Sequence, residues 1–507
     1  MNYSMESKKR LLPVEAANLQ NSSLKEHPGL GKVLLVYMAP EDSNYQLGGE
    51  GIYKIVRRPQ LGFLYISGTF KEVGINHAIL DQTCELFDED DIVRTCQEEN
   101  IAWVGFYTVD ATVHKITQCL RRIKETLPGQ LLVVGGPGTL APRPYLDAGA
   151  DIAVLGEGEY ASVELCEYAL NMRDLDNIQG ICYLKNDEIV RTQSRTLADL
   201  DLLPPANRDL IDVNKYRDLL IINNRLPYTT MITSRGCPFT CTFCSSPTIW
   251  NHKVRQRSVK NVLQEIDLLI GKYGVKYISF QDDIFGLNNR WLDDFCQQLR
   301  DRKYDLNWMC ILHPKSILNK RGEMLDLMKS AGLDTISIGV QSADATVLQN
   351  INRRKEETQL CCELIQEAKS RQILTATNMI FGLPGESEQS IQTSIDFVLG
   401  LRPHHVMFYR FTLIHGSALE RQGEKAIKCN LNTAELDWWV TRATRSYNFN
   451  SKVLWQLVTY ILWNKPGWLW SAIKIFPTLV RILGLGKPEE TPTMHRDRNP
   501  KIGVRSC

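Results

Sequence analysis

Three cysteines, Cys237, Cys241 and Cys244, stand within eight residues of one another. Thiolates are soft ligands, and three of them on so short a segment can surround one metal centre. A four-iron cluster has four corners, so three cysteines leave one iron open to a small substrate, as catalytic zinc sites keep an open position. Structural zinc is the alternative, but its fourth ligand would have to be His252 or a distant cysteine.

The composition sets the broad class of the protein. At 507 residues the chain exceeds what one hydrophobic core supports, which predicts two or three domains. Its formal net charge is +1, so no general basic field attracts nucleic acid, and none is expected as a partner. Residues 1–29 lack the apolar stretch of a secretory signal. We therefore expect a cytoplasmic protein whose cysteines stay reduced and available to a metal.

Strand and helix patterns alternate in the first part of the chain. Apolar runs predict strands at 33–37, 77–80, 102–106, 131–134 and 152–155, and helix-length segments lie near 61–72, 90–99, 111–126 and 160–170. This alternation is typical of an α/β fold. It predicts a doubly wound, Rossmann-like parallel sheet over residues 32–185, after a polar lead-in at 1–31.

Glycines follow two of these predicted strands. Gly135 and Gly136 come after the fourth strand, and Gly156, Glu157 and Gly158 come after the fifth. Ligands bind at the carboxyl ends of the strands in such sheets, and glycine permits close approach of backbone to ligand. The alternative is that both segments are only tight turns.

A second series of strands and helices follows a polar segment, residues 186–226, that is predicted to be a linker. Strands are predicted at 229–233, 276–280, 307–311, 335–340, 375–381 and 405–411, and helices at 259–273, 289–302, 320–331, 355–370 and 388–399. Six strand–helix units fall short of the eight in a closed barrel, so residues 227–425 are expected to form an open, partial (β/α)6 barrel. The three cysteines directly follow its first strand.

The cysteine spacing and its place in the barrel resemble a known family. Cys-x3-Cys-x2-Cys after the first strand of a partial barrel is the signature of the radical S-adenosylmethionine (SAM) enzymes, and the aromatic Phe243 fits the same pattern. The resemblance implies a [4Fe–4S] cluster held by Cys237, Cys241 and Cys244, with SAM bound at the open iron. It also implies cleavage of SAM to a 5′-deoxyadenosyl radical, with an electron from an external donor such as flavodoxin or ferredoxin.

Other segments resemble the SAM contacts of this family and arrive in order at successive strand ends. The implied contacts are Gln281, Asp282 and Asp283 for the methionine amino group, Gly339, Gln341 and Ser342 for the ribose and the methionine carboxylate, Arg353 for that carboxylate, and Gly382 and Pro384 for adenine. Gln341 stands where the family commonly has glutamate. Each segment alone is weak, since a pair such as Asp282 and Asp283 is usually a solvated turn.

The first domain resembles that of the cobalamin-binding subfamily. Residues 58–62, ahead of the first helix, and the two glycine segments after the fourth and fifth strands match its landmarks. The resemblance implies cobalamin as a further cofactor. The Asp-x-His-x-x-Gly segment that supplies a histidine to cobalt in other cobalamin proteins is absent, which implies no histidine, or a non-standard ligand, on the lower face of the cobalt.

Three functions are compatible with these features. The first is a cobalamin-dependent methyltransferase that acts on an unactivated carbon of a small or lipophilic biosynthetic intermediate, because such a carbon is no nucleophile for a sulfonium. The second is an oxidative cyclase or rearrangement enzyme of the anaerobic tetrapyrrole type, which transfers no methyl group. The third is a non-catalytic metal-binding module. The sequence leaves the substrate open.

The last part of the chain, residues 426–507, is predicted to be helical. Residues 452–486 contain no Asp or Glu, and their four tryptophans are spaced by Lys452, Lys465, Lys474 and Arg481. This pattern is compatible with short helices broken at prolines that lie on a membrane surface, because tryptophan prefers the lipid–water interface. The alternative is that these helices cap the open barrel and bury the same tryptophans.

Overall fold

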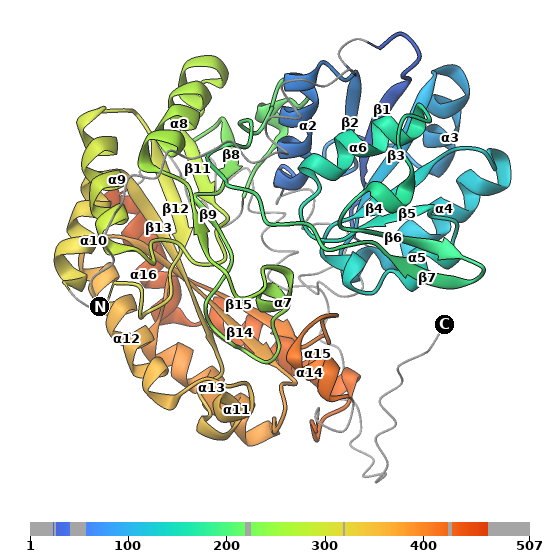
Figure 1. Cartoon of the computed structure of the whole chain (residues 1–507). Coiled ribbons are helices and arrows are strands. Elements are labelled where there is room, and N and C mark those ends of the chain that lie inside the picture. Colours follow the sequence, from blue (N-terminus) through green and yellow to red (C-terminus); the bar gives the residue numbers. More distant parts are fainter. Residues whose placement is uncertain are drawn as a thin grey trace, which may run out of the picture. The chain divides into compact units, whose positions relative to one another are not determined.

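The computed structural model describes residues 24, 27–40, 57–218, 225–317, 320–423 and 428–464. The chain divides into two compact units. Of the described residues, those up to 38 and 60–211 form unit 1, and residues 39–40, 57–59 and those from 212 onward form unit 2. Figure 1 labels the elements of both units.

Unit 1 is built on one sheet with the strand order β2-β1-β3-β4-β5-β6-β7. The strands are β1 (Lys32–Tyr37), β2 (His77–Asp81), β3 (Ile101–Tyr107), β4 (Leu132–Gly135), β5 (Ile152–Val154), β6 (Ile181–Lys185) and β7 (Glu188–Arg191). Strands β1 to β5 run parallel, whereas β6 and β7 are antiparallel. The order 2-1-3-4-5 is that of a doubly wound sheet, whose strand order reverses between β1 and β3.

Helices cover both faces of this sheet. They are α2 (Leu61–Val73), α3 (Glu89–Glu98), α4 (Val113–Thr126), α5 (Arg143–Asp147) and α6 (Glu159–Ala169). One apolar cluster joins the sheet to α2 and α6 through residues such as Phe70 and Leu165. A second cluster on the opposite face joins it to α3, α4 and α5 through residues such as Ile92 and Leu120. The predicted doubly wound, Rossmann-like sheet is confirmed.

The structure of unit 1 continues into the segment that was predicted to be a linker. Strand β7 lies within residues 186–226 and pairs with β6. Farther along, the Asn207 amide donates to Ser67 Oγ on α2 at 3.0 Å, and Asp209 pairs with Lys71 at 2.6 Å. Polar composition suggested a linker here, but these polar side chains are partners of α2.

Unit 2 contains six parallel strands in the order β15-β14-β13-β12-β11-β8. The strands are β8 (Tyr228–Met231), β11 (Tyr277–Phe280), β12 (Asn307–Ile311), β13 (Leu333–Gln341), β14 (Leu374–Phe381) and β15 (His405–Arg410). The connecting helices are α8 (Val259–Tyr273), α9 (Asn289–Asp301), α10 (Arg321–Ser330), α12 (Lys355–Ser370) and α13 (Glu388–Leu401). Within the described residues β15 and β8 each end the sheet, so the predicted open, partial barrel is confirmed.

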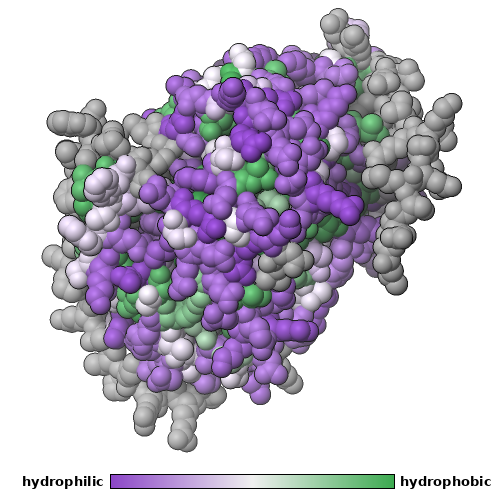
Figure 2. Space-filling view, turned by 90° about the vertical axis from the view of Figure 1, so that its left-hand side faces the viewer, coloured by the Kyte–Doolittle hydropathy of each residue, from purple (hydrophilic) through white to green (hydrophobic). Residues whose placement is uncertain are grey.

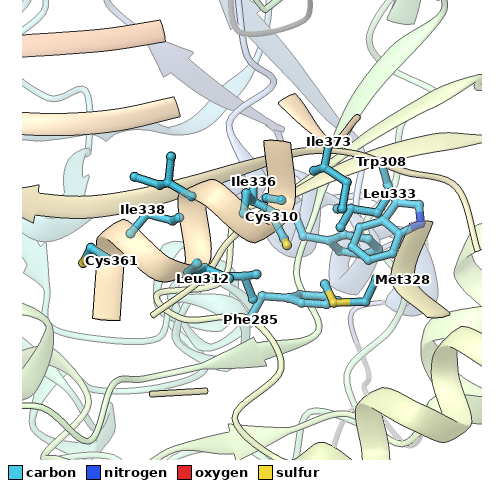
Figure 3. Packing of buried hydrophobic residues seen from close by; sticks show 14 of the residues in the cluster. Phe285, Trp308, Cys310, Leu312, Met328, Leu333, Ile336, Ile338, Cys361 and Ile373 are labelled. Atoms are coloured by element: carbon cyan, nitrogen blue, oxygen red, sulfur yellow. The ribbon is translucent and has the colours of Figure 1, made fainter. Parts of the chain in front are cut away.

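The two faces of the unit 2 sheet differ in chemistry. On β13, Ile336 and Ile338 pack into the apolar layer beneath the helices, whereas Ser337 and Gly339 alternate with them on the other face. Figure 3 shows this layer, in which Trp308 of β12 and the β13 isoleucines meet Met328 and Cys361. Because successive side chains of a strand point to opposite faces, the inner face of the barrel carries the small and polar residues.

Residues 57–59 belong to the barrel although they precede α2. Arg58 Nε donates to Asp218 Oδ2 at 2.5 Å, and Tyr228 at the start of β8 donates to the same carboxylate. Thr230 Oγ1 donates to the carbonyl oxygen of Pro59 at 3.2 Å. A buried polar network therefore occupies the amino end of the barrel.

The described C-terminal residues are helical, as predicted. Helix α15 (Thr433–Asn448) adds Leu436, Trp439 and Val440 to the outer apolar layer of the barrel, and α16 (Ser451–Asn464) follows it. Residues 465–507 lie outside the described residues. The face shown in Figure 2 is mostly hydrophilic, and hydrophobic residues appear on it only in small patches.

Candidate active site

The three cysteines lie on one loop, residues 236–245, here called the cysteine loop. It follows the short strand β9 (Ser234–Arg235) and ends at α7 (Ser246–Ile249). Gly236 opens the loop with φ +103°, and a Cβ there would lie 2.0 Å from the Lys253 carbonyl oxygen. Only glycine fits this position without a shift of the backbone.

The thiols of the cysteine loop are half-buried and form no disulfide. Burial raises the pKa of Cys237 to about 12 and that of Cys244 to about 11. Burial also raises the pKa of Cys241. The positive charge of Arg353 lowers this pKa, but burial has the larger effect. Without a metal these groups are thiols, so metal binding must displace their protons.

The three cysteines of the loop lie near one another. The three sulfurs interact electrostatically with one another. Across the described ranges, however, no three His, Cys, Asp or Glu side chains converge as the ligands of one metal ion do. His252, the fourth ligand considered for zinc, is exposed.

Two carboxylates at the end of β11 hold the entrance of the cysteine loop. Asp282 is 1% exposed, and its oxygens accept from the backbone N–H of Thr233 at 2.7 Å and from the Thr233 and Ser234 hydroxyls. Asp283 Oδ2 accepts from the Gly236 N–H at 2.9 Å. Burial raises the pKa of Asp282 to about 6. Gln281, beside this pair, donates to Ser279 Oγ at 2.6 Å. Their contact with the methionine amino group stays a prediction.

A charged network contacts the cysteine loop from the other side. The ring of His313, after β12, stacks on Phe239 of the loop with centroids 4.0 Å apart. His313 Nε2 lies 3.4 Å from Arg353 Nη2, and Arg353 Nε donates to Glu357 Oε2 at 3.0 Å. Lys315 Nζ donates to the other oxygen of Glu357 at 2.5 Å. Burial and the adjacent Arg353 lower the pKa of His313 to about 4, so the ring is neutral near pH 7.

Arg353 makes more contacts within the protein than its predicted role requires. It is 6% exposed, and its Nη1 donates to the Gly339 carbonyl oxygen at 2.7 Å, in addition to its contacts with Glu357 and His313. It thereby joins the carboxyl end of β13 to α12. Its pairing with the methionine carboxylate of SAM stays a prediction. Sequence reasoning missed His313, whose only signal was its place after the third strand of the barrel.

Two unpartnered acceptors face the interior of the barrel. Gln341 has φ +73°, a backbone conformation that is rare for residues other than glycine, and its buried Oε1 has no hydrogen-bond partner. Asn378 lies opposite Gly339 in the register of β14 and β13, and its Oδ1 is likewise buried without a partner. Because a buried acceptor without a partner is costly, both amides fit a ligand that carries hydroxyl or ammonium donors, as SAM does.

The remaining predicted SAM residues lie in two different surroundings. Ser342 is 1% exposed, and its hydroxyl lies 3.4 Å from Ser394 of α13. Gly382, with φ +96°, opens the loop after β14, where Pro384 accepts from the Asn350 amide at 2.9 Å. Leu383 of this loop belongs to a small apolar cluster that Phe243 of the cysteine loop joins. The structure thus brings the loop after β14 to the cysteine loop.

In unit 1 the predicted cobalamin residues gather at the carboxyl ends of β4 and β5. Gly136 has φ +97°, and a Cβ there would lie 2.8 Å from the Thr108 carbonyl oxygen. Gly156 has φ +84°, and a Cβ there would meet nothing within 4 Å, so this edge is open. Glu157 is already used, since its Oε2 accepts from the Ala198 N–H at 2.8 Å. The open, glycine-lined edge fits a bulky ligand that approaches the backbone closely.

Comparison with known proteins identifies a domain family in each part of the chain. The family described as the radical SAM superfamily matches residues 231–398, and the B12 binding domain family matches residues 57–166. An uncharacterised methyltransferase of Pyrococcus horikoshii is 27% identical over 79% of this chain and 84% of its own. The anaerobic magnesium-protoporphyrin IX monomethyl ester cyclase of Rubrivivax gelatinosus is 26% identical over 73% of this chain and 66% of its own.

A solved structure has a similar fold. The radical SAM methyltransferase TsrM of Kitasatospora setae, with tryptophan and a SAM analogue bound, superposes with a TM-score of 0.61 at 18% identity, over 77% of this chain and 75% of its own. The chain belongs to the radical SAM superfamily, in the subfamily that carries a B12-binding domain. Its cofactors are a [4Fe–4S] cluster, SAM and cobalamin, and it is an enzyme rather than a non-catalytic metal-binding module.

Proposed function

We propose that this enzyme transfers a methyl group to an unactivated carbon of a small or lipophilic biosynthetic intermediate. The observation that carries the proposal is the presence, in one chain, of a B12-binding domain and of a radical SAM barrel with a three-cysteine loop. When bound, the cofactors supply a transferable methyl group and a radical that removes hydrogen from the substrate. The relative from Pyrococcus horikoshii is named a methyltransferase, which supports this function.

The protein's own groups position these cofactors. Cys237, Cys241 and Cys244 would hold the cluster, while Asp282 and Asp283 fix the start of their loop through buried hydrogen bonds. Gln341 Oε1 and Asn378 Oδ1, which have no partner in the barrel, would accept hydrogen bonds from SAM. Fixed acceptors of this kind orient the methionine group before reaction, so no reorganisation is needed during it.

The interior of the barrel is where a substrate would meet the radical. Its inner face carries the small side chains Ser279, Ser337 and Ala376, each beside a neighbouring strand. The electron would come from an external flavodoxin or ferredoxin. A buried, water-poor interior protects a reactive carbon radical from side reactions.

Product analysis tests this proposal. Reduced, anaerobically prepared protein loaded with cobalamin should convert SAM to S-adenosylhomocysteine as well as to 5′-deoxyadenosine, measured by mass spectrometry. Protein prepared without cobalamin is the control and should form no S-adenosylhomocysteine. If the loaded enzyme forms only 5′-deoxyadenosine, methyl transfer is wrong.

A second candidate is an oxidative cyclase or rearrangement enzyme with the same cofactors. It is favoured by the similarity to the cyclase of Rubrivivax gelatinosus, which covers 73% of this chain. Cyclisation consumes SAM only through the radical route, so 5′-deoxyadenosine alone would be the outcome that supports it.

A further inference from the structure

Helix α16 carries an unpartnered apolar stripe on its outer side. The stripe consists of Leu454, Trp455, Val458, Leu462 and Trp463, which are 42%, 71%, 43%, 49% and 84% exposed. The spacings of four and eight residues place these side chains on one side of the helix. Contiguous exposed apolar surface of this kind marks a contact site in a water-soluble fold.

The inner side of α16 is firmly attached to unit 2. Val453, Tyr460 and Ile461 are buried at 4%, 8% and 4% exposure. The Gln456 amide donates to the Arg402 carbonyl oxygen at 3.0 Å, and the Tyr460 ring meets the His404 ring with centroids 4.9 Å apart. The orientation of the stripe is therefore set by packing. The alternative that these helices bury their tryptophans against the barrel is wrong for Trp455 and Trp463.

We propose that the outer side of α16 docks this enzyme onto an anionic membrane surface. Tryptophan and leucine would enter the boundary between headgroups and acyl chains, where amphipathic helices lie parallel to the bilayer. Among the described residues, none of the helices has the length and hydropathy of a membrane span.

The positive charge of the sequence around and after α16 favours an anionic lipid surface as the partner of the stripe. The sequence from residue 452 to 486 contains four cations, Lys452, Lys465, Lys474 and Arg481, and no acidic residue. Anionic headgroups attract such a segment. Residues 465–486 lie outside the described residues and enter this argument through their sequence alone.

The place of α16 leaves the active site free. Its contacts, Arg402, His404 and Gln372, precede β15 and β14 in the chain, so the helix lies at the amino end of these strands. The cysteine loop follows the carboxyl end of β8. Docking would thus hold the enzyme at the surface without covering the carboxyl edge of the barrel. A lipophilic substrate, which rests on the proposed function, would make such a location useful.

Flotation with vesicles tests the proposal on the full-length chain. Wild type should float with phosphatidylcholine vesicles that contain phosphatidylglycerol, and a W455Q/W463Q variant should float about tenfold less, since it loses the two most exposed aromatic side chains. The control is L268Q on α8, where another exposed apolar side chain, at 37% exposure, should not matter. Because flotation requires neither turnover nor cofactor, its result is independent of the proposed methyl transfer.

Several outcomes would overturn the proposal. Wild type that stays with the unbound fraction, or W455Q/W463Q that floats as wild type does, would show that the stripe binds no lipid. Equal flotation on vesicles of phosphatidylcholine alone would remove the role of the anionic headgroups. A wild-type dimer that becomes a monomer in W455Q/W463Q, measured by light scattering, would assign the stripe to a second copy instead.

Discussion

The two sheets of this chain are expected to bind their ligands at different places because their strands differ in one respect. Strand β1 of unit 1 is apolar on both faces, and buried clusters lie on each side of its sheet. Strand β13 of unit 2 alternates, with isoleucines under the helices and Ser337, Gly339 and Gln341 on the inner face. A sheet covered on both faces can bind a ligand only at an edge, whereas the barrel keeps a polar interior.

This difference indicates where each cofactor is expected to bind. In unit 1 the open positions are glycines at the carboxyl ends of β4 and β5, such as Gly156. In unit 2 the candidate groups are two side chains on the inner face of the strands, Gln341 and Asn378, whose amide oxygens have no partner. The site in unit 1 is open because glycine has no side chain. The site in unit 2 offers side-chain acceptors that have no partner in the protein. Variants should therefore separate the two cofactors.

The largest expected effect is loss of the cluster from unit 2. Replacing Cys237, Cys241 and Cys244 together with alanine should abolish iron binding at this loop and formation of 5′-deoxyadenosine, because no ligand set remains. Cobalamin binding should persist. Iron analysis and product chromatography measure the two effects. Cys84→Ala, at a cysteine of unit 1 outside the cysteine loop, is the control and should keep the iron.

Gly156→Val should have the opposite selectivity. A branched side chain would fill the open edge and strain a backbone with φ +84°, so cobalamin retained through gel filtration should fall at least about tenfold while the iron content stays unchanged. Gly129→Val is the control, because a Cβ there also meets nothing within 4 Å but its φ is not in the left-handed region. Equal loss of cobalamin in both variants would refute the assignment of this edge.

A smaller effect is expected from the network beside the cysteine loop. Glu357→Ala leaves Arg353 and Lys315 without their shared carboxylate, and removal of one partner of a buried pair costs about 3–5 kcal/mol of unfolding free energy. Glu323→Ala breaks an exposed pair with Lys320 and should cost less than about 1 kcal/mol. Anaerobic urea unfolding of both variants gives the comparison. Similar costs would mean that Glu357 does not stabilise the barrel.

The last expected effect is a pH dependence of unfolding to which buried histidines of unit 2 contribute. Burial lowers the pKa of His404 and of His405 to about 4 in the folded chain. A depressed folded pKa means that the unfolded chain binds protons first, so stability is present above about pH 6.5 and is lost as the pH falls toward 4, by about 3 kcal/mol per histidine. His404→Asn should flatten this slope in unfolding measured from pH 8 to pH 5. His114→Asn, at an exposed position of α4, should leave it unchanged.

The elements of both sheets were largely predictable from the sequence, because hydrophobic period and length suffice for buried strands and amphipathic helices. The predicted helices at 259–273 and 355–370 coincide with α8 and α12. Strand β7 was missed because its short, polar sequence, Glu188–Arg191, forms the edge of the sheet. Edge strands are exposed and carry little hydrophobic signal.

The site was predictable where a motif carries the chemistry and not where packing does. The cysteine spacing identified the loop, but nothing in the sequence shows that Asp282 turns toward Thr233 and Ser234 or that His313 stacks on Phe239. Such contacts depend on the relative position of strand ends that lie far apart in the chain. The positive φ of Gln341 is likewise a property of the folded strand.

Two differently built sites in this chain are expected to hold the two metal cofactors, the [4Fe–4S] cluster and cobalamin. The most direct test is iron and cobalt analysis of one anaerobically reconstituted wild-type sample, followed by reduction in the presence of SAM. We expect about four irons at the cysteine loop and about one cobalt per chain. S-adenosylhomocysteine and 5′-deoxyadenosine should both form. A sample that takes up iron but no cobalt, or that holds both metals and cleaves no SAM, would contradict this expectation.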